Sequence, residues 1–189
     1  MNKKKAIATL EAILFAMGDS VEVSKLAMVI DADESVTREY LEEMTEKYKK
    51  GNGGIMMAWY DDSVQLCTKP EFYDDLVKIA TVPKKHVLTD SCIETLSIVA
   101  YKQPVTRSEI ERIRGVNCDH AVNRLLELEL ITELGRLDAP GKPILFGTTE
   151  TFLKTFGVRS VDDIPHPDAV AIEEFKQQAE EEVQLSLGI

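Results

Sequence analysis

The side chains that could do chemistry are scattered along the chain and are not grouped at the spacings that catalysis or metal binding needs. No two of the histidines and cysteines stand at metal-ligand spacing: His86, His120, His166, Cys67, Cys92 and Cys118. An odd number of cysteines without a Cys-x-x-Cys pair predicts neither a zinc site nor a disulfide framework. Such cysteines are typical of small buried side chains in a reducing cytoplasm. His120 follows Cys118 so closely that the two side chains would diverge on a helix, so these two would not form a catalytic couple.

The carboxylates and the glycine-rich stretch also have structural explanations. Asp61 and Asp62 fall in a predicted turn, where aspartate commonly bonds the backbone. A phosphate-binding loop would need a strand before its glycines and a helix after them. Residues 51–54 (GNGG) follow a predicted helix and precede a predicted strand, so they indicate a helix end. We therefore expect no enzyme, no cofactor, no metal and no small-molecule substrate.

Composition narrows the class of protein. With 189 residues and 44% hydrophobic content, the chain is long enough for one ordinary domain or two small ones. Its formal net charge of −11 would repel naked duplex DNA. The basic start, Met1 to Lys5, is followed by an amphipathic stretch interrupted by Glu11 rather than by the apolar core of a signal peptide. No apolar run approaches the ~20 residues that span a bilayer. We expect a soluble cytoplasmic protein with no membrane partner.

The second half of the chain has a clear order of predicted elements. A nearly all-apolar helix over 91–101 stops at 102–104 (KQP), a second helix opens near Thr106 and ends at Gly115, and a third covers 117–129. Strands at 131–136 and 144–148 then form a hairpin, and a short helix with Phe152, Leu153 and Phe156 ends at Gly157. Three helices followed by a β-hairpin wing are typical of a winged helix.

The first half repeats this order without repeating the residues. Helices are predicted over 4–17, from a Ser24 cap through 30, and over 34–49, then strands at 55–60 and 64–68 and a closing helix over 71–80. The predicted fold class is therefore α+β, mainly helical, with two tandem winged-helix domains. Their expected bounds are 1–80 and 87–164, with a Pro-containing linker at 81–86 and an acidic tail at 165–189.

Two segments leave alternatives open. Apolar side chains occupy adjacent positions of the strand at 55–60, so they would lie on both of its faces: Met56, Met57 and Trp59. A partner chain would cover the second face, or the unit's own closing helix would. The tail could be a solvated acidic segment or a helix that docks only in a complex.

The net charge of the third predicted helix in each half disfavours binding to DNA. Residues 33–50 hold six acidic and four basic side chains, and residues 117–130 hold three acidic and one basic, a net of −2 in each. Counterion release supplies most non-specific DNA affinity, and these helices could neutralise few phosphates. Arg107, Arg112 and Arg114 stand beside Glu109 and Glu111, which indicates ion pairs within the chain. The pattern favours a protein-binding winged helix; a DNA-binding transcriptional regulator is the alternative.

Several stretches carry a family resemblance. They are 94–107 (ETLSIVAYKQPVTR), 109–116 (EIERIRGV), Gly135-Arg136, 140–149 (PGKPILFGTT), Phe152-Leu153 and Phe156-Gly157. Together they resemble the signature of segregation and condensation protein B, ScpB. The chain departs from that signature at Lys142, where the family usually has Arg, and at Phe146, where Tyr is common. Neither change alters the charge or the aromatic character of its position.

The resemblance implies a function. ScpB proteins are tandem winged-helix, non-enzymatic adaptor subunits of the bacterial SMC–ScpA–ScpB complex, which acts in chromosome condensation and segregation at the nucleoid. They form homodimers mainly through the N-terminal unit, bind the kleisin ScpA and reach SMC through it, so DNA contact is at most indirect. On this basis we expect kleisin binding at Tyr101, Arg107, Phe152, Leu153 and Phe156. We expect dimerisation through Met56, Met57 and Trp59. A purely architectural role for Tyr101, Arg107 and Arg114 is the alternative.

Overall fold

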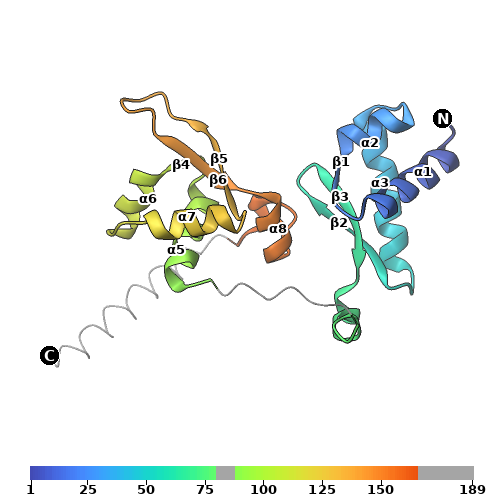
Figure 1. Cartoon of the computed structure of the whole chain (residues 1–189). Coiled ribbons are helices and arrows are strands. Elements are labelled where there is room, and N and C mark those ends of the chain that lie inside the picture. Colours follow the sequence, from blue (N-terminus) through green and yellow to red (C-terminus); the bar gives the residue numbers. More distant parts are fainter. Residues whose placement is uncertain (80–87, 166–189) are drawn as a thin grey trace.

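The computed structural model describes residues 1–79 and 88–165 (Figure 1). The linker and tail predictions, apart from residue 165, and His86 and His166 lie outside these residues. The structure confirms an α+β, mainly helical chain with small antiparallel sheets. None of the helices in the described ranges is long and apolar enough to cross a membrane.

The first half builds three helices and a three-stranded sheet. The helices are α1 (Lys3–Met17), α2 (Val23–Ile30) and α3 (Glu34–Lys50), and the strands are β1 (Val21–Glu22), β2 (Ile55–Tyr60) and β3 (Ser63–Thr68). The sheet order is β1-β3-β2, all antiparallel, and Trp59 pairs with Val64. One apolar cluster, from Ala6 to Leu66, joins the helices to one face of this sheet.

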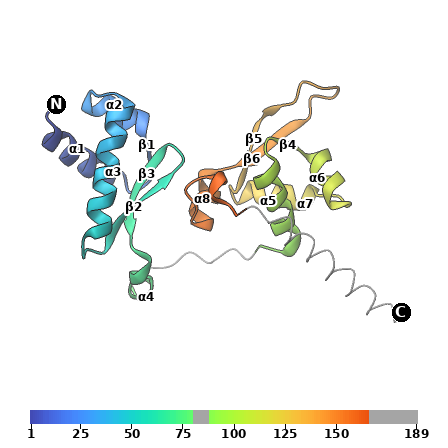
Figure 2. The same ribbon diagram turned by 180° about the vertical axis from the view of Figure 1, so that it is seen from behind.

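The second half builds the same arrangement. Its elements are α5 (Asp90–Lys102), β4 (Val105–Thr106), α6 (Arg107–Arg114), α7 (Asp119–Glu127), β5 (Ile131–Arg136), β6 (Ile144–Thr148), α8 (Glu150–Phe156) and η2 (Val161–Asp163). The sheet order is β4-β6-β5, with a register shift between Glu133 and Gly135. A second apolar cluster, centred on residues such as Ile110, Leu125 and Phe146, forms its core. Figures 1 and 2 show the hairpin β5–β6 projecting away from the first half.

Helix ends follow the glycine signals in the sequence. Gly18, Gly115 and Gly157 each take a left-handed conformation and cap α1, α6 and α8. At the other end of α6, Thr106 and Glu109 form a capping box, in which each side chain accepts a hydrogen bond from the other's backbone N–H. The predicted opening near Thr106 and the stop at Gly115 are therefore confirmed.

Four predicted boundaries are wrong. Ser24 does not cap α2, because that helix begins at Val23 and Glu22 takes the cap position without a side-chain bond. Ser63 belongs to β3 rather than to the preceding turn. The third helix of the second half stops at Glu127, because Glu129 adopts a positive φ of 55° as the chain turns into β5. The helix expected over 71–80 is a 3-10 turn, η1 (Pro70–Phe72), followed by the single turn α4 (Tyr73–Leu76).

The short closing helix changes what covers β2. Phe72, Leu76 and Ile79 remain 37%, 42% and 93% exposed, so the alternative in which a closing helix buries its apolar face on the sheet does not hold. Tyr60, at the end of β2, packs instead against the apolar cluster of the second half. The part of β2 nearest its C-terminal end is therefore covered by the other half of the molecule.

Candidate partner-binding surfaces

An apolar groove of about 270 Å³ lies between α5 and α8. It brings together three of the five residues expected to bind a kleisin, Tyr101, Phe152 and Phe156. Phe156 is 51% exposed, and its ring centroid stands 4.8 Å from that of the buried Phe152. Leu153 is 2% exposed and belongs to the core beneath the groove. Tyr101 and Phe156 therefore present the accessible surface, while Phe152 and Leu153 support it.

The chain itself occupies one end of this groove. Ile164 and Pro165 line it, and the Tyr101 hydroxyl donates a hydrogen bond of 2.6 Å to the Pro165 carbonyl. Ile164 and Pro165 therefore form part of the groove wall beside α5.

The fifth expected residue, Arg107, is engaged within its own half. Its guanidinium pairs with Asp119, donates to Asn123 and stands 5.9 Å from the centre of the Phe146 ring. These contacts tie the start of α6 to α7. Arg107 does not reach the groove between α5 and α8.

Arg114 has a similar architectural position on the other side of α6. Its side chain is only 7% exposed and pairs with Glu94 at 2.9 Å, with a further bond of 3.1 Å to Ser91. The predicted ion pairs within the chain are confirmed at Arg107 and Arg114, with Asp119 and Glu94 as partners rather than the neighbouring Glu109 and Glu111. Those carboxylates bond the backbone instead, Glu109 at the α6 cap and Glu111 at the Cys118 N–H, because caps leave free N–H groups to be satisfied.

The residues expected to dimerise divide between two faces of β2. Met57 and Trp59 are 4% and 6% exposed and lie in the core of the first half. The Trp59 indole N–H donates to the Thr45 hydroxyl at 3.0 Å. Met56 lies on the other face of the strand and is half-buried, and all three residues line a groove beside the second half.

Sequence reasoning missed the exposed apolar side chains on the outer faces of α1 and α2. They are Phe15 at 76%, Met17 at 61%, Met28 at 74% and Val29 at 55% exposure. Met17 is not part of the buried stripe of α1, which consists of Ala6, Leu10 and Leu14. Phe15 directly follows Leu14 and therefore lies off that stripe, which is the signal that could have identified it.

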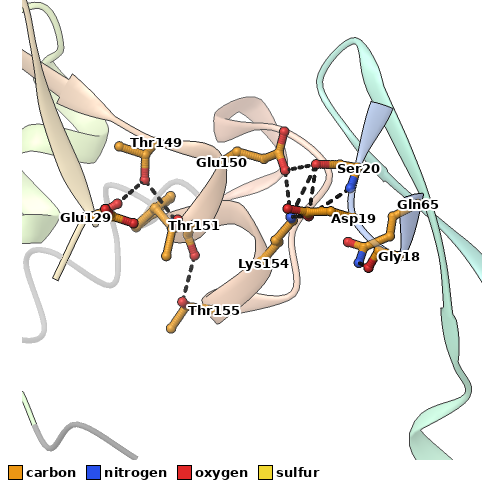
Figure 3. Close-up of polar contacts among 11 residues, drawn as sticks. Gly18, Asp19, Ser20, Gln65, Glu129, Thr149, Glu150, Thr151, Lys154 and Thr155 are labelled. Carbon is orange, nitrogen blue, oxygen red and sulfur yellow. Dashed lines mark hydrogen bonds and ion pairs between the residues drawn. The ribbon is translucent and has the colours of Figure 1, made fainter. Parts of the chain in front are cut away.

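Polar contacts join the two halves at a junction between the α1–β1 loop and α8 (Figure 3). The Lys154 ammonium lies 2.6 Å from Asp19 and 2.8 Å from Glu150, and the Ser20 hydroxyl donates to Glu150. Lys154 also stands 5.5 Å from the centre of the Tyr60 ring. One loop of the first half thus meets one helix of the second through Lys154 and Glu150.

The electrostatics of this junction are mutually supporting. The hydrogen bond from Lys154 lowers the pKa of the Asp19 carboxyl. Burial disfavours the charged form of Lys154, but hydrogen bonds to Asp19 and Glu150 outweigh it and raise the pKa of the amine. A backbone bond of 2.7 Å from the Asp61 N–H to the Arg159 carbonyl provides a second link. Burial raises the pKa of Asp61.

A larger groove of about 620 Å³ spans both halves beside this junction. The first half contributes Met56 to Tyr60 of β2, which come from both faces of the strand, together with Glu42, Thr45 and Glu46 of α3. The second half contributes Gly157, Val158 and Arg159. The groove therefore depends on how the two halves are held together.

The described residues hold no cluster of three or more side chains able to bind a metal. The cysteines behave as expected in part: Cys92 and Cys118 are buried, whereas Cys67 is half-buried, and burial raises the pKa of its thiol. None of these thiols has a histidine bonded to it within the described ranges. The accessible features are apolar and charged surfaces, which indicates recognition of other molecules.

Comparison with known proteins identifies the family. The model of the segregation and condensation complex subunit ScpB matches residues 8–167. Segregation and condensation protein B of Lachnoclostridium phytofermentans is 52% identical over 189 residues, covering 100% of both chains. The protein of the same name from Agathobacter rectalis is 53% identical over 190 residues, again covering 100% of both chains. The chain belongs to the ScpB family, as the resemblance in its sequence predicted.

Two solved structures are similar to this chain at lower identity. The crystal structure of ScpB from Mycobacterium tuberculosis is 30% identical, covers 84% of this chain and 98% of that one, and has a TM-score of 0.41. A dimer of the ScpB N-terminal domain complexed with an ScpA peptide is 31% identical and covers 41% of this chain and 96% of that one, with a TM-score of 0.39.

Proposed function

We propose that this chain is a non-enzymatic adaptor of the bacterial SMC–ScpA–ScpB complex, acting in chromosome condensation and segregation at the nucleoid in the cytoplasm. The observation that carries this proposal is the family match over residues 8–167 together with 52% identity to a full-length relative. SMC is reached through ScpA, and DNA contact is indirect. The net charge of −11 supports this, because it disfavours direct binding to a polyanion.

We also propose that each half is a winged-helix domain, at 1–80 and 87–164, joined by the linker 81–86 and followed by the tail 165–189. The support is that each half has its own apolar cluster, three helices and a hairpin in the same order. Each domain has fewer than ~80 residues, a size at which a partner commonly adds stability.

For the kleisin, the groove between α5 and α8 is the preferred site. The support is that the exposed Phe156 and Tyr101 offer apolar and polar contacts side by side in an apolar groove that Ile164 and Pro165 also line. An ScpA segment that binds here displaces or extends these two residues. Arg107 supports the domain rather than the partner, because its guanidinium is already paired.

For the homodimer, Met56 is the member of the predicted set that a second chain could reach. Met57 and Trp59 are buried in the core of their own domain, so they would affect dimerisation only by stabilising that domain. The exposed side chains of α1 and α2, above all Phe15 and Met28, extend the proposed dimer surface. Covering large apolar side chains that are more than half exposed would supply much of the driving force.

The test is light scattering on a size-exclusion column, with the full chain alone and mixed with the ScpA central segment. The chain mass is 21.2 kDa, so a dimer elutes with twice that mass, and a heavier complex forms with ScpA. The variant Phe156→Glu should weaken ScpA binding about tenfold or more, since a charge then enters the groove. Ile113→Glu, on the exposed face of α6, is the matched control.

The contradictory result is a monomer that ignores ScpA. Phe156→Glu that stays folded by circular dichroism and binds ScpA like the parent would refute the site but leave the adaptor role. A steep salt-dependent affinity of the isolated chain for duplex DNA would favour the alternative of a DNA-binding transcriptional regulator.

A further inference from the structure

A cationic pocket of about 270 Å³ lies between the start of α6 and the hairpin β5–β6. We call it the wing pocket, and its lining includes Arg107, Ser108, Arg136, Lys142, Ile144 and Phe146. Three of these side chains are basic and none of the lining residues is acidic, in a chain whose net charge is −11. Residues of two separate sequence stretches, 107–108 and 136–146, meet here.

The three cations are not equally available. Arg107 is neutralised by its pair with Asp119. Arg136 uses one nitrogen to bond the Lys142 carbonyl at 3.0 Å, which is a neutral acceptor. No carboxylate of the described residues pairs with Arg136 or Lys142, whereas Arg38, Arg114 and Arg124 each have one. Two positive charges therefore remain uncompensated by direct ion pairs at the pocket.

The loop that carries Lys142 is fixed by its own backbone. The Lys142 N–H donates to the Ala139 carbonyl at 2.8 Å, and the Leu137 N–H donates to the Pro143 carbonyl at 2.9 Å. Gly141 and Lys142 both adopt positive φ, at 82° and 43°. A non-glycine residue in this conformation is uncommon, and it persists because the bonds around it hold the turn. The lysine is thus presented by an ordered turn.

The other wall of the pocket is apolar. Phe146 is 1% exposed, with Arg107 over its ring, and Ile144 is half-buried beside it. The Ser108 hydroxyl adds a neutral polar group at the start of α6. A ligand that fits these walls carries a negative charge next to an apolar group, so that both parts find a complementary surface.

We propose that the wing pocket binds a carboxylate of an acidic segment in a partner protein. Arg136 and Lys142 hold the carboxylate, and an adjacent apolar side chain of the segment lies on Ile144 and Phe146. The inference is independent of the adaptor function, since it concerns the chemistry of the segment and not the protein that carries it.

A nucleic-acid phosphate fits the surroundings less well. Arg107 is already paired with Asp119, so only Arg136 and Lys142 could meet a phosphate at the pocket. Each phosphate of a duplex is followed by others, and two cations compensate few of them. A carboxylate on a peptide brings a single charge and its own apolar neighbours.

The experiment measures fluorescence anisotropy of a labelled peptide of alternating glutamate and leucine residues, titrated with the full chain. The parent chain should bind it, and raising ionic strength from about 50 to about 300 mM should weaken binding by screening. Lys142→Glu should lower the affinity about tenfold or more, because it reverses the charge at the pocket. Lys102→Glu makes the same charge change on the exposed end of α5 and should alter the affinity less than about twofold.

Three results would overturn the proposal. They are no binding by the parent chain, equal losses in Lys142→Glu and Lys102→Glu, or a short DNA duplex that binds more tightly than the peptide and loses affinity through Lys142→Glu. Size-exclusion with the ScpA segment is run on the same samples as a separate readout. If the parent chain does not bind the ScpA segment, the adaptor function is refuted. The peptide titration still tests the wing pocket separately.

Discussion

The two hairpins occupy the same position in their halves of the chain, but they are covered differently. In β2, Met57 and Trp59 enter the core of the first half, and Tyr60 packs on the apolar cluster of the second. In β5, only Ile131 is buried and the following five residues are exposed. The same order of elements thus gives one hairpin that joins the molecule together and one that is open to other molecules.

The largest expected effect that separates the two hairpins is on stability. Trp59→Ala should lower the free energy of unfolding by about 3–5 kcal/mol, because it empties a core position and removes the bond to Thr45. Leu134→Ala, at a side chain 55% exposed on β5, should cost about 0.5 kcal/mol or less. Urea unfolding followed by circular dichroism measures both, and similar losses would remove the contrast.

A smaller effect distinguishes the second helices of the two halves. Thr106→Ala should cost about 1 kcal/mol, since it breaks the capping box at α6 and leaves the Glu109 N–H without its side-chain acceptor. Glu22→Ala, at the uncapped start of α2, should change stability by only a few tenths of a kcal/mol, because its exposed pair with Lys25 contributes little. Thermal unfolding of both variants decides this, and an equal cost would show that the box adds nothing.

The smallest expected change in stability is at the junction. Lys154→Met removes the contacts with Asp19 and Glu150 and should cost about 1 kcal/mol or less. The distance between fluorescent labels on α1 and α7 should broaden, because the two halves lose their main polar link. Lys25→Met, which breaks a pair within the first half, should leave that distance unchanged. An unchanged distance in Lys154→Met would show that the backbone link at Asp61 suffices.

Acid should act on the junction through Asp19. The folded-state pKa of this carboxyl lies below its ordinary value of 3.8, so its contribution is present above that value and is lost as pH falls through the lowered pKa. Lys154 has a folded-state pKa above 10.5, so its contribution is complete below that value and lost as pH rises through the raised pKa. The label distance should therefore stay constant between pH 5 and pH 9. A transition inside that window would contradict this assignment.

Local signals predicted most of the fold. Hydrophobic period and turn residues placed the strands β2, β5 and β6, and glycines placed the ends of α1, α6 and α8. The prediction that Ser24 caps α2 failed. Serine is a common cap, but here the chain enters α2 directly from the two-residue strand β1. The α4 prediction failed because apolar period alone does not supply a surface to pack on.

Non-local contacts were beyond the reach of sequence patterns. Asp19 and Lys154 are 135 residues apart, and nothing in either stretch indicates the other. The sequence predicted apolar side chains on both faces of β2, but it did not indicate that Tyr60 packs against the second half. The groove of Tyr101 and Phe156 could be anticipated from the family signature, but its occupation by Pro165 could not.

The confinement of the first apolar cluster to residues Ala6 to Leu66 has a consequence for synthesis on the ribosome. All of its members have been translated before α5 exists, so this half can close while the rest of the chain is still being made. The junction with Lys154 needs residues of α8 and therefore forms only after most of the second half has been translated. A nascent first half therefore leaves Tyr60 uncovered until the second half has been translated and has folded against it.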